Sequence, residues 1–206
     1  VAVLAWFAAL GWRTSNGSYL APDGPGTPRS DYRAVTLEMP LRAALGRLNP
    51  GIPAVALNNA AARIVADASQ DPLENNRNFL KLLRDGVDVE FRDGNQAVTR
   101  RARFIDLNDM RRNEFLAVQQ FTIQGADTRR PDVIAFVNGL PLGVIELKGP
   151  ASTVGTIKGA FNQLQTYRQK IPALFRFNAV MVISDGLEAR VGSLTADLER
   201  YGPWRT

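Results

Sequence analysis

The chain has 206 residues, of which 45% are apolar and 22% are charged. This length and balance are typical of one soluble globular domain with a real core, and they exclude disordered and collagen-like classes. The sequence contains no histidine and no cysteine. Zinc sites built from those residues, cysteine nucleophiles, Ser-His-Asp triads and disulfide frameworks are therefore excluded. Any hydrolysis must rest on carboxylates, lysine, hydroxyls and a hard cation.

The net charge of +5 indicates a polyanionic partner only weakly. An arginine-rich composition explains this charge equally well. The first ten residues, "VAVLAWFAAL", are apolar but fall short of the roughly 18 to 20 residues that a membrane span needs. Val3, Phe7 and Leu10 follow helical spacing and predict a core-facing helix. Without an export signal or cysteine, we expect a cytoplasmic protein with no membrane contact, and the start at Val1 indicates a piece of a longer chain.

The first half of the chain is predicted to be rich in helices. Residues 13–31 are rich in Gly, Pro and Ser and predict a flexible surface loop. A helix with leucines at helical spacing follows, and "NPG" ends it. "AVALNNAAARIVADA" predicts a second helix that ends near Ser69. A third is expected between Asp71, a plausible N-cap, and Gly86.

After Gly86 the apolar spacing becomes that of strands. "VDVEF" and "AVTRRARFIDL" flank the turn signal "RDGNQ", and "FLAVQQFTI" predicts a further strand. Two apolar runs within residues 129–150 predict a hairpin, and "TIKGAFNQLQTYRQ" predicts an amphipathic helix. "NAVMVISDG" and "EARVGSL" predict two more strands. We therefore predict a single α/β domain over 1–206, with a mixed central sheet flanked by helices. No GxxxxGK[ST] loop is present, so ATP has no evident site.

The hairpin carries three charged residues at its open end. Its strands "VIAFV" and "LGVIEL" are joined by "NGLP", a strong turn signal. Glu146 and Lys148 point to one face because side chains alternate along a strand. Directly opposite residues in an antiparallel pair share a face. Asp132 therefore shares the face of Glu146 only if the residue numbers of opposite residues add up to an even number. This requires a loop with an odd number of residues. We therefore predict a loop of three or five residues.

Convergence of Asp132 and Glu146 would be repulsive unless a cation lies between them. Mg²⁺ is the expected ion, because it takes oxygen ligands and keeps several waters. Such an ion activates water and neutralises charge on a phosphodiester, while Lys148 can orient the attacking hydroxide or stabilise the transition state. The alternative is structural: Glu146 and Lys148 form an exposed ion pair, and Asp132 caps a strand.

Gln163 and Tyr167 are four residues apart and lie on one face of the late helix. They could orient the lysine or a DNA phosphate, although packing of Tyr167 against the sheet is the simpler explanation. Weaker candidates for contact with DNA phosphates are Arg129, Arg130, Lys158 and Arg168. A second basic cluster comprises Arg100, Arg101, Arg103, Arg111 and Arg112. A solvated face accounts for these basic residues equally well.

The block "RRPDVIAFVNGLPLGVIELKGP" followed by "AFNQLQTYR" closely resembles the N-terminal endonuclease domain of the type I restriction enzyme R subunit. This domain belongs to the PD-(D/E)xK nuclease superfamily. The resemblance begins near Trp6 and covers nearly the whole chain. It implies a restriction-endonuclease-like core with metal-binding Asp132 and Glu146 and catalytic Lys148. It also implies a role for Gln163 and Tyr167 in cleavage.

The resemblance further implies Mg²⁺-dependent cutting of double-stranded DNA in a complex with modification and specificity subunits. ATP would serve only a downstream motor. Many nucleases of the superfamily carry an additional acid on the first helix, which "VAVLAWFAAL" lacks. Two alternatives stay open: a DNA-docking or scaffold domain that is inactive in isolation, and a nuclease of another restriction or repair system.

Overall fold

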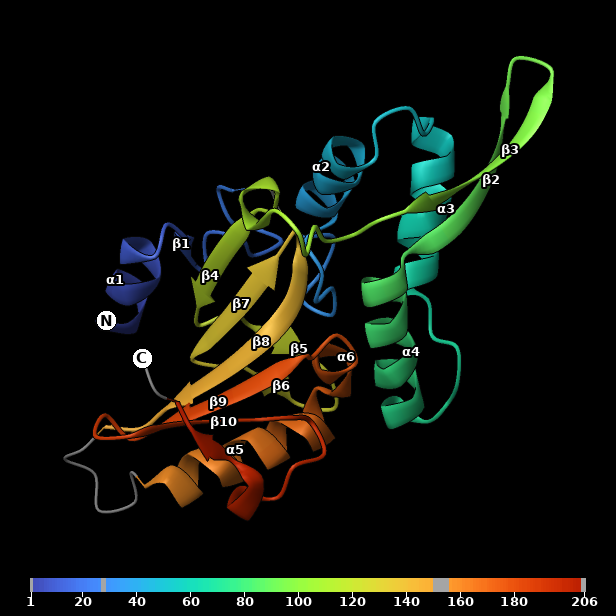
Figure 1. Ribbon diagram of the computed structural model, residues 1–206. Helices are drawn as coiled ribbons and strands as arrows, with labels where there is room; N and C mark the ends of the chain where they lie inside the picture. The colour runs from blue at the N-terminus through green and yellow to red at the C-terminus, as the bar shows by residue number, and fades with distance from the viewer. Residues whose placement is uncertain (1, 27–28, 150–155, 205–206) are drawn as a thin grey trace. The chain divides into compact units, whose positions relative to one another are not determined.

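The computed structural model describes residues 2–26, 29–149 and 156–204 (Figure 1). The chain forms two compact units within the region where we expected a single domain. The first unit comprises Val1–Val35, Phe115–Phe136 and Pro141–Thr206, and the second comprises Thr36–Glu114 and Val137–Leu140. The first unit holds every residue of the expected catalytic set.

A seven-stranded mixed sheet, with the order β1-β4-β7-β8-β9-β10-β11, confirms the predicted α/β class (Figure 1). β1 pairs with β4 in parallel and β8 with β9 in parallel, whereas β10 is antiparallel to β9 and β11. The strands are β1 (Arg13–Asn16), β4 (Phe115–Gln119), β7 (Val133–Val137), β8 (Leu140–Leu147), β9 (Val180–Ser184), β10 (Ala189–Gly192) and β11 (Gly202–Pro203).

β7 and β8 are central because their sequences are almost entirely apolar. Every residue of β7 is buried, as is every residue of β8 except Leu147. Continuous apolar runs suit strands that are covered on both faces. These two strands therefore form a rigid base for the charged residues at their ends.

Helix α1 (Ala2–Ala9) packs on the sheet as predicted, through Val3 and Phe7. These side chains contact a buried cluster that includes Val133 and Ile145. Leu10 does not join them: it lies beyond the helix and is 75% exposed, so that part of the prediction is wrong.

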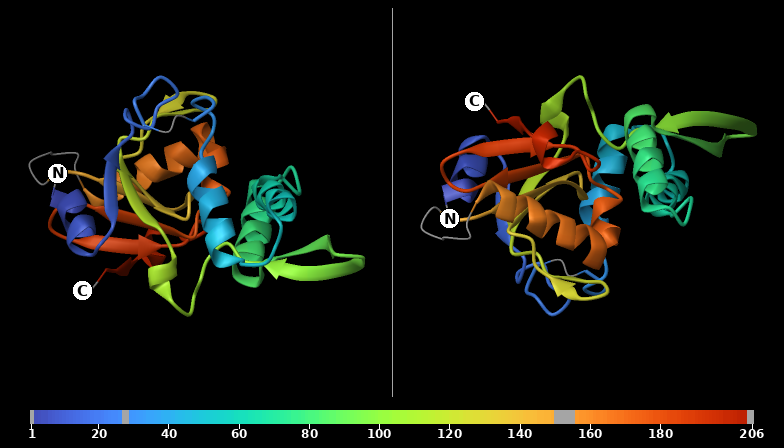
Figure 2. Two further views of the ribbon diagram at one scale, coloured as in Figure 1. Left: turned by 90° about the horizontal axis from the view of Figure 1, so that it is seen from above. Right: turned by 90° about the horizontal axis from the view of Figure 1, so that it is seen from below.

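Helix α5 (Ile157–Lys170) begins at Thr156, whose hydroxyl accepts a hydrogen bond from Gly159 N at 3.1 Å. The helix lies against the sheet (Figure 2) and contacts β9. It buries Leu164 and Tyr167. Ile145 belongs to the cluster beneath α1. Glu146, the next residue of β8, therefore points to the opposite face. The short helix α6 (Pro172–Phe175) follows α5.

Two further predictions for the first unit need correction. Residues 13–16 of the expected loop form strand β1, because they pair with β4. The predicted strand "FLAVQQFTI" is broken after Gln119. Gln120 has a φ of +54°, and this left-handed conformation ends the strand. The chain then continues into β5 (Ile123–Gln124), which pairs with β6 (Thr128–Arg129) in a separate small sheet.

The second unit contains the three predicted helices: α2 (Glu38–Leu48), α3 (Ala54–Val65) and α4 (Pro72–Asp85). Asp71 caps α4, accepting a hydrogen bond from Leu73 N at 2.9 Å, and Gly86 follows with φ +80°, both as expected. α3 ends at Val65, earlier than the expected end near Ser69, because Ala66 is already extended. β2 (Val87–Asp93) and β3 (Gln96–Ala102) form a separate antiparallel hairpin.

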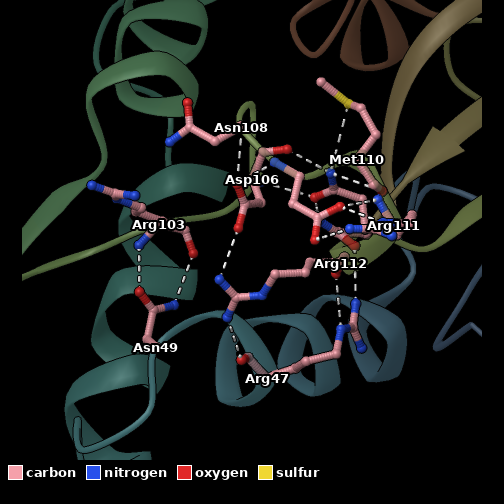
Figure 3. A network of polar contacts seen from close by, with 11 residues as sticks. Arg47, Asn49, Arg103, Asp106, Asn108, Met110, Arg111 and Arg112 are labelled. Atoms are coloured by element: carbon pink, nitrogen blue, oxygen red, sulfur yellow. Dashed lines mark hydrogen bonds and ion pairs between the residues drawn. The ribbon is translucent and has the colours of Figure 1, made fainter.

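A polar network organises the segment after β3, around the short 3-10 helix η1 (Met110–Arg112) (Figure 3). The Asn49 side chain binds both backbone groups of Arg103. Its Oδ1 accepts a hydrogen bond from Arg103 N at 2.7 Å, and its Nδ2 donates one to Arg103 O at 2.8 Å. Asn113 binds the backbone N and O of Asp106 in the same way. The buried Asn138 side chain accepts a bond from Glu114 N at 2.8 Å. These amides satisfy backbone groups that no sheet partner serves.

Among the described residues, no helix has the length and apolar character needed to traverse a lipid bilayer.

Candidate active site

The turn between β7 and β8 has two residues, Asn138 and Gly139, with φ values of +52° and +80°. Both values suit a tight hairpin turn, for which Asn-Gly is a preferred pair. The prediction of a three- or five-residue loop is therefore wrong.

The two strands of the hairpin nevertheless have the register that places Asp132 and Glu146 on one face. A Cβ atom on Gly143 would lie 3.1 Å from the Ala135 Cβ, so these residues face the same side. Val133 and Ile145 also share one buried cluster. The residue numbers of each of these pairs add up to an even number. A two-residue turn alone would instead pair residues whose numbers add up to an odd number. We infer one extra residue in β8 between the turn and Gly143, where Pro141 cannot donate a ladder hydrogen bond.

Asp132 lies one residue before β7, at the point where the ladder ends. Its Oδ2 accepts a hydrogen bond from the backbone N of Leu147 at 2.9 Å, so the side chain is tied to the end of β8. Its Oδ1 accepts a bond from Gln120 Nε2 at 3.0 Å. The first contact ties the carboxylate to the strand that carries Glu146, and the second ties it to the residue after β4.

Glu146 is only 2% exposed. Its Oε1 accepts a hydrogen bond from Lys148 Nζ at 2.6 Å, which is short, as expected for a charged pair. Burial raises the pKa of Glu146 to about 7, and the negative charge of Asp132 adds to this effect. Lys148 and the Tyr167 hydroxyl act in the opposite direction without cancelling it. The pair is therefore not the exposed ion pair of the structural alternative.

Tyr167 and Gln163 extend the site onto α5. The Tyr167 ring is buried, and its hydroxyl interacts with both the Gln163 amide and the Glu146 carboxylate. Burial raises the pKa of Tyr167 above its ordinary value, as does the nearby charge of Glu146. The phenol therefore stays protonated and can donate a hydrogen bond to the carboxylate. All five residues predicted for catalysis are thus linked by contacts or by electrostatic interaction.

The donor set fits a hard divalent cation. Oε2 of Glu146 is buried and has no hydrogen-bond partner within the described residues, an arrangement that is costly unless something satisfies the atom. Asp132 supplies a second carboxylate. In the described parts of the chain, no group of three or more His, Cys, Asp or Glu residues could hold a metal. Mg²⁺ suits this chemistry because it is bound through one or two carboxylates and keeps several waters.

The basic residues predicted to contact DNA lie in different settings. Arg130 is exposed and lines a cavity of about 800 Å³ together with Gln120. Arg129 is half-buried and pairs with Asp127 at 3.1 Å. Lys158 is exposed on the first turn of α5, and Arg168 binds Gln165 Oε1 at 2.6 Å. Arg130 and Lys158 are therefore the freer candidates for phosphate contacts.

The second basic cluster is largely engaged by neighbouring groups. Arg101 pairs with Asp88, Arg111 with Asp109 and Arg112 with Asp106, at 2.8 to 2.9 Å. Figure 3 shows the pair of Arg112 and Asp106. Arg100 donates to the Gly51 carbonyl at 3.2 Å. These local partners favour the interpretation of a solvated, structural face.

Sequence reasoning missed Gln120, because the residue falls inside a segment that reads as one continuous strand. Only its left-handed backbone conformation turns it toward Asp132. The sequence carries no signal for this change, apart from the polar pair "QQ" in an otherwise apolar run.

Comparison with known proteins identifies the family. Residues 1–200 match the family model described as "Type I restriction enzyme R protein N terminus". The chain is 38% identical over 199 residues to the type I restriction enzyme HindI endonuclease subunit of Haemophilus influenzae. That match covers 96% of this chain and 19% of the relative.

A second relative is the type I restriction enzyme SauMSSORF170P endonuclease subunit of Staphylococcus aureus. It is 32% identical over 111 residues, which cover 53% of this chain and 11% of the relative. The chain thus spans at most about a fifth of the length of these relatives. Since the family model covers nearly every residue, this chain belongs to the family of N-terminal regions of type I restriction enzyme R proteins.

Proposed function

We propose that this chain is a Mg²⁺-dependent endodeoxyribonuclease domain that hydrolyses phosphodiester bonds of double-stranded DNA. The observation that carries the proposal is the buried Glu146, with one oxygen bound to Lys148 and the other without a hydrogen-bond partner in the described structure. Asp132, tied to the same strand end, supplies the second carboxylate. The names of the relatives, endonuclease subunits of type I restriction enzymes, support the same activity.

In this proposal, Asp132 and Glu146 hold the ion. When bound, Mg²⁺ supplies positive charge that polarises water and neutralises charge developing on the phosphate. Lys148 remains beside Glu146 and donates hydrogen bonds toward the attacking water or a phosphate oxygen. Tyr167 holds the Glu146 carboxylate in place from α5, and Gln163 supports the phenol.

We further propose that the domain acts within a type I restriction complex containing modification and specificity subunits. The subunit names of the relatives support such an assembly. ATP would be used elsewhere in the complete enzyme, because this chain has no phosphate-binding GxxxxGK[ST] loop. A cytoplasmic location, where restriction would act on DNA, is part of the same proposal.

The test uses the complete restriction enzyme acting on supercoiled plasmid with Mg²⁺ and ATP. Asp132→Asn and Lys148→Ala should lose cleavage while keeping the fold and DNA binding, because both positions act in the chemical step. Matched controls are Asp197→Asn and Lys81→Ala, which change exposed residues outside the proposed site. Cleavage at wild-type rates by both site variants would refute the assignment. DNA binding by the wild-type enzyme without cleavage would instead favour a docking role.

A further inference from the structure

We propose that Gln120 is a positioning residue for the metal-binding Asp132, a role that rests on the proposed nuclease function. Gln120 reaches this acid through two separate bonds. Its backbone N donates to the Asp132 carbonyl at 3.0 Å, and its Nε2 donates to Asp132 Oδ1 at 3.0 Å. The carboxylate and the backbone that carries it are thus held by the same residue.

The backbone of Gln120 is bent into a conformation that a glutamine rarely adopts. Its φ of +54° lies in the left-handed region, which disfavours residues with a Cβ. Local strain of this kind is often found at functional sites, where the surrounding structure maintains it. Here the conformation ends β4 and aims the amide at Asp132. An ordinary strand continuation would send the side chain elsewhere.

Gln120 is also confined on its carbonyl side. Gly17 N donates to Gln119 O at 2.7 Å. A Cβ on residue 17 would lie 2.1 Å from the Gln120 carbonyl oxygen. The chain after β1 therefore presses against Gln120 and allows no side chain at that point. The backbone of Gln120 is held between this segment and the Asp132 carbonyl, which fixes the point from which its side chain reaches Asp132 Oδ1.

The bonds leave Asp132 able to bind a cation. An ionised carboxylate offers about four lone-pair positions. Gln120 uses one on Oδ1 and Leu147 N uses one on Oδ2, so each oxygen retains acceptor capacity. Residues that orient metal ligands in this way typically change metal affinity or activity by about 10- to 100-fold when they are replaced. We expect an effect of this size at Gln120.

The experiment compares Gln120→Ala and Gln120→Gly with a matched control, Gln119→Ala, which changes the neighbouring glutamine at the end of β4. Mn²⁺ binding to the 206-residue chain is measured by electron paramagnetic resonance, and unfolding is measured by heating. Both Gln120 variants should weaken the Mn²⁺ Kd by about 10-fold or more. The glycine variant should match or exceed the alanine variant in Tm, because it relieves the left-handed strain.

If Gln120 only stabilised the fold, the Mn²⁺ affinity of its variants would change in parallel with their Tm. The Gln120→Gly variant would then bind Mn²⁺ normally. Cleavage by the complete enzyme provides a second criterion. In a Mg²⁺ titration, the variants should need more ion for half-maximal rate and should recover most of the rate at saturation. Wild-type Mn²⁺ affinity in both Gln120 variants, together with lost binding in Asp132→Asn, would overturn the role of Gln120 alone. Wild-type binding and cleavage in Asp132→Asn would overturn the metal site itself, and the role of Gln120 with it.

Discussion

Lys148 Nζ lies 2.6 Å from Oε1 of Glu146, although Glu146 is almost completely buried. A buried carboxylate is costly unless it is paired. The pairing with Lys148 is incomplete, since Oε2 has no hydrogen-bond partner in the described residues and the pKa stays raised. Burial therefore favours the protonated form of Glu146, and a cation at Oε2 would offset this cost, as the proposed function requires.

The raised pKa of Glu146 predicts a pH-dependent stability of the metal-free chain. Between the ordinary value of 4.5 and about 7, the folded state holds a proton that the unfolded state releases. Stability should therefore fall as pH rises through this window, by at most on the order of 3 kcal/mol. Urea unfolding in EDTA at a series of pH values measures the slope. Glu146→Gln should flatten it, and an unchanged slope in this variant would contradict the assignment.

Removal of the lysine should shift metal binding to higher pH. In Lys148→Met, Glu146 loses the nearby positive charge that favours its ionised form, so its pKa should rise further. Because binding requires the ionised carboxylate, the pH midpoint of Mn²⁺ binding should increase. Titration of Mn²⁺ affinity against pH gives the midpoint directly. Equal midpoints in Lys148→Met and the wild type would show that the lysine does not tune this acid.

Tyr167 and Gln163 should act on catalysis through Glu146. Tyr167→Phe keeps the buried ring but removes the hydroxyl that interacts with the carboxylate. Cleavage should fall by about 10- to 100-fold, as for other residues that orient a ligand. Gln163→Ala should have a smaller effect, and the double variant should resemble Tyr167→Phe, because both act along one chain of contacts. Additive losses in the cleavage rate of the double variant would argue for independent roles.

Arg130 should contribute to DNA binding more than Arg101 does. Arg130 is exposed at the cavity beside Gln120, whereas Arg101 pairs with Asp88 at 2.8 Å. Arg130→Ala should weaken binding of a short DNA duplex. It should also reduce the dependence of the binding constant on salt concentration by the equivalent of about one phosphate contact. Arg101→Ala is the matched control and should leave both unchanged. Fluorescence anisotropy at several salt concentrations measures them, and equal effects of the two substitutions would refute the distinction.

Arg29 should matter for stability rather than catalysis. Its guanidinium is buried and donates to three backbone carbonyls, those of Leu20, Ala34 and Thr122, at 2.9 to 3.2 Å. Its pKa is lowered to about 10 by burial. Arg29→Met leaves these carbonyls unsatisfied and should cost about 2 to 4 kcal/mol in unfolding free energy. Chemical denaturation measures this loss, and Arg33→Ala, at an exposed position, should stay within about 0.5 kcal/mol of the wild type.

Much of the fold could be predicted because its signals are local. The helix at 72–85 has a capping aspartate, a proline at its first position and a glycine after its end, and each acts within a few residues. The apolar runs of β7 and β8 predicted the hairpin for the same reason. The number of residues in the turn was predicted wrongly. Pro141 and the extra residue in β8 alter the register only once the two strands pair, so the sequence alone does not show their effect.

The sequence by itself determined which groups are available for chemistry: two acids and a lysine at the ends of apolar strands, with no histidine or cysteine to compete. The tertiary structure alone decided that Glu146 is buried, that Tyr167 reaches it from α5, and that Gln120 turns toward Asp132. Residue types and spacing are carried by the chain. Burial and side-chain approach depend on segments distant in sequence, whose meeting is set by packing of the whole sheet.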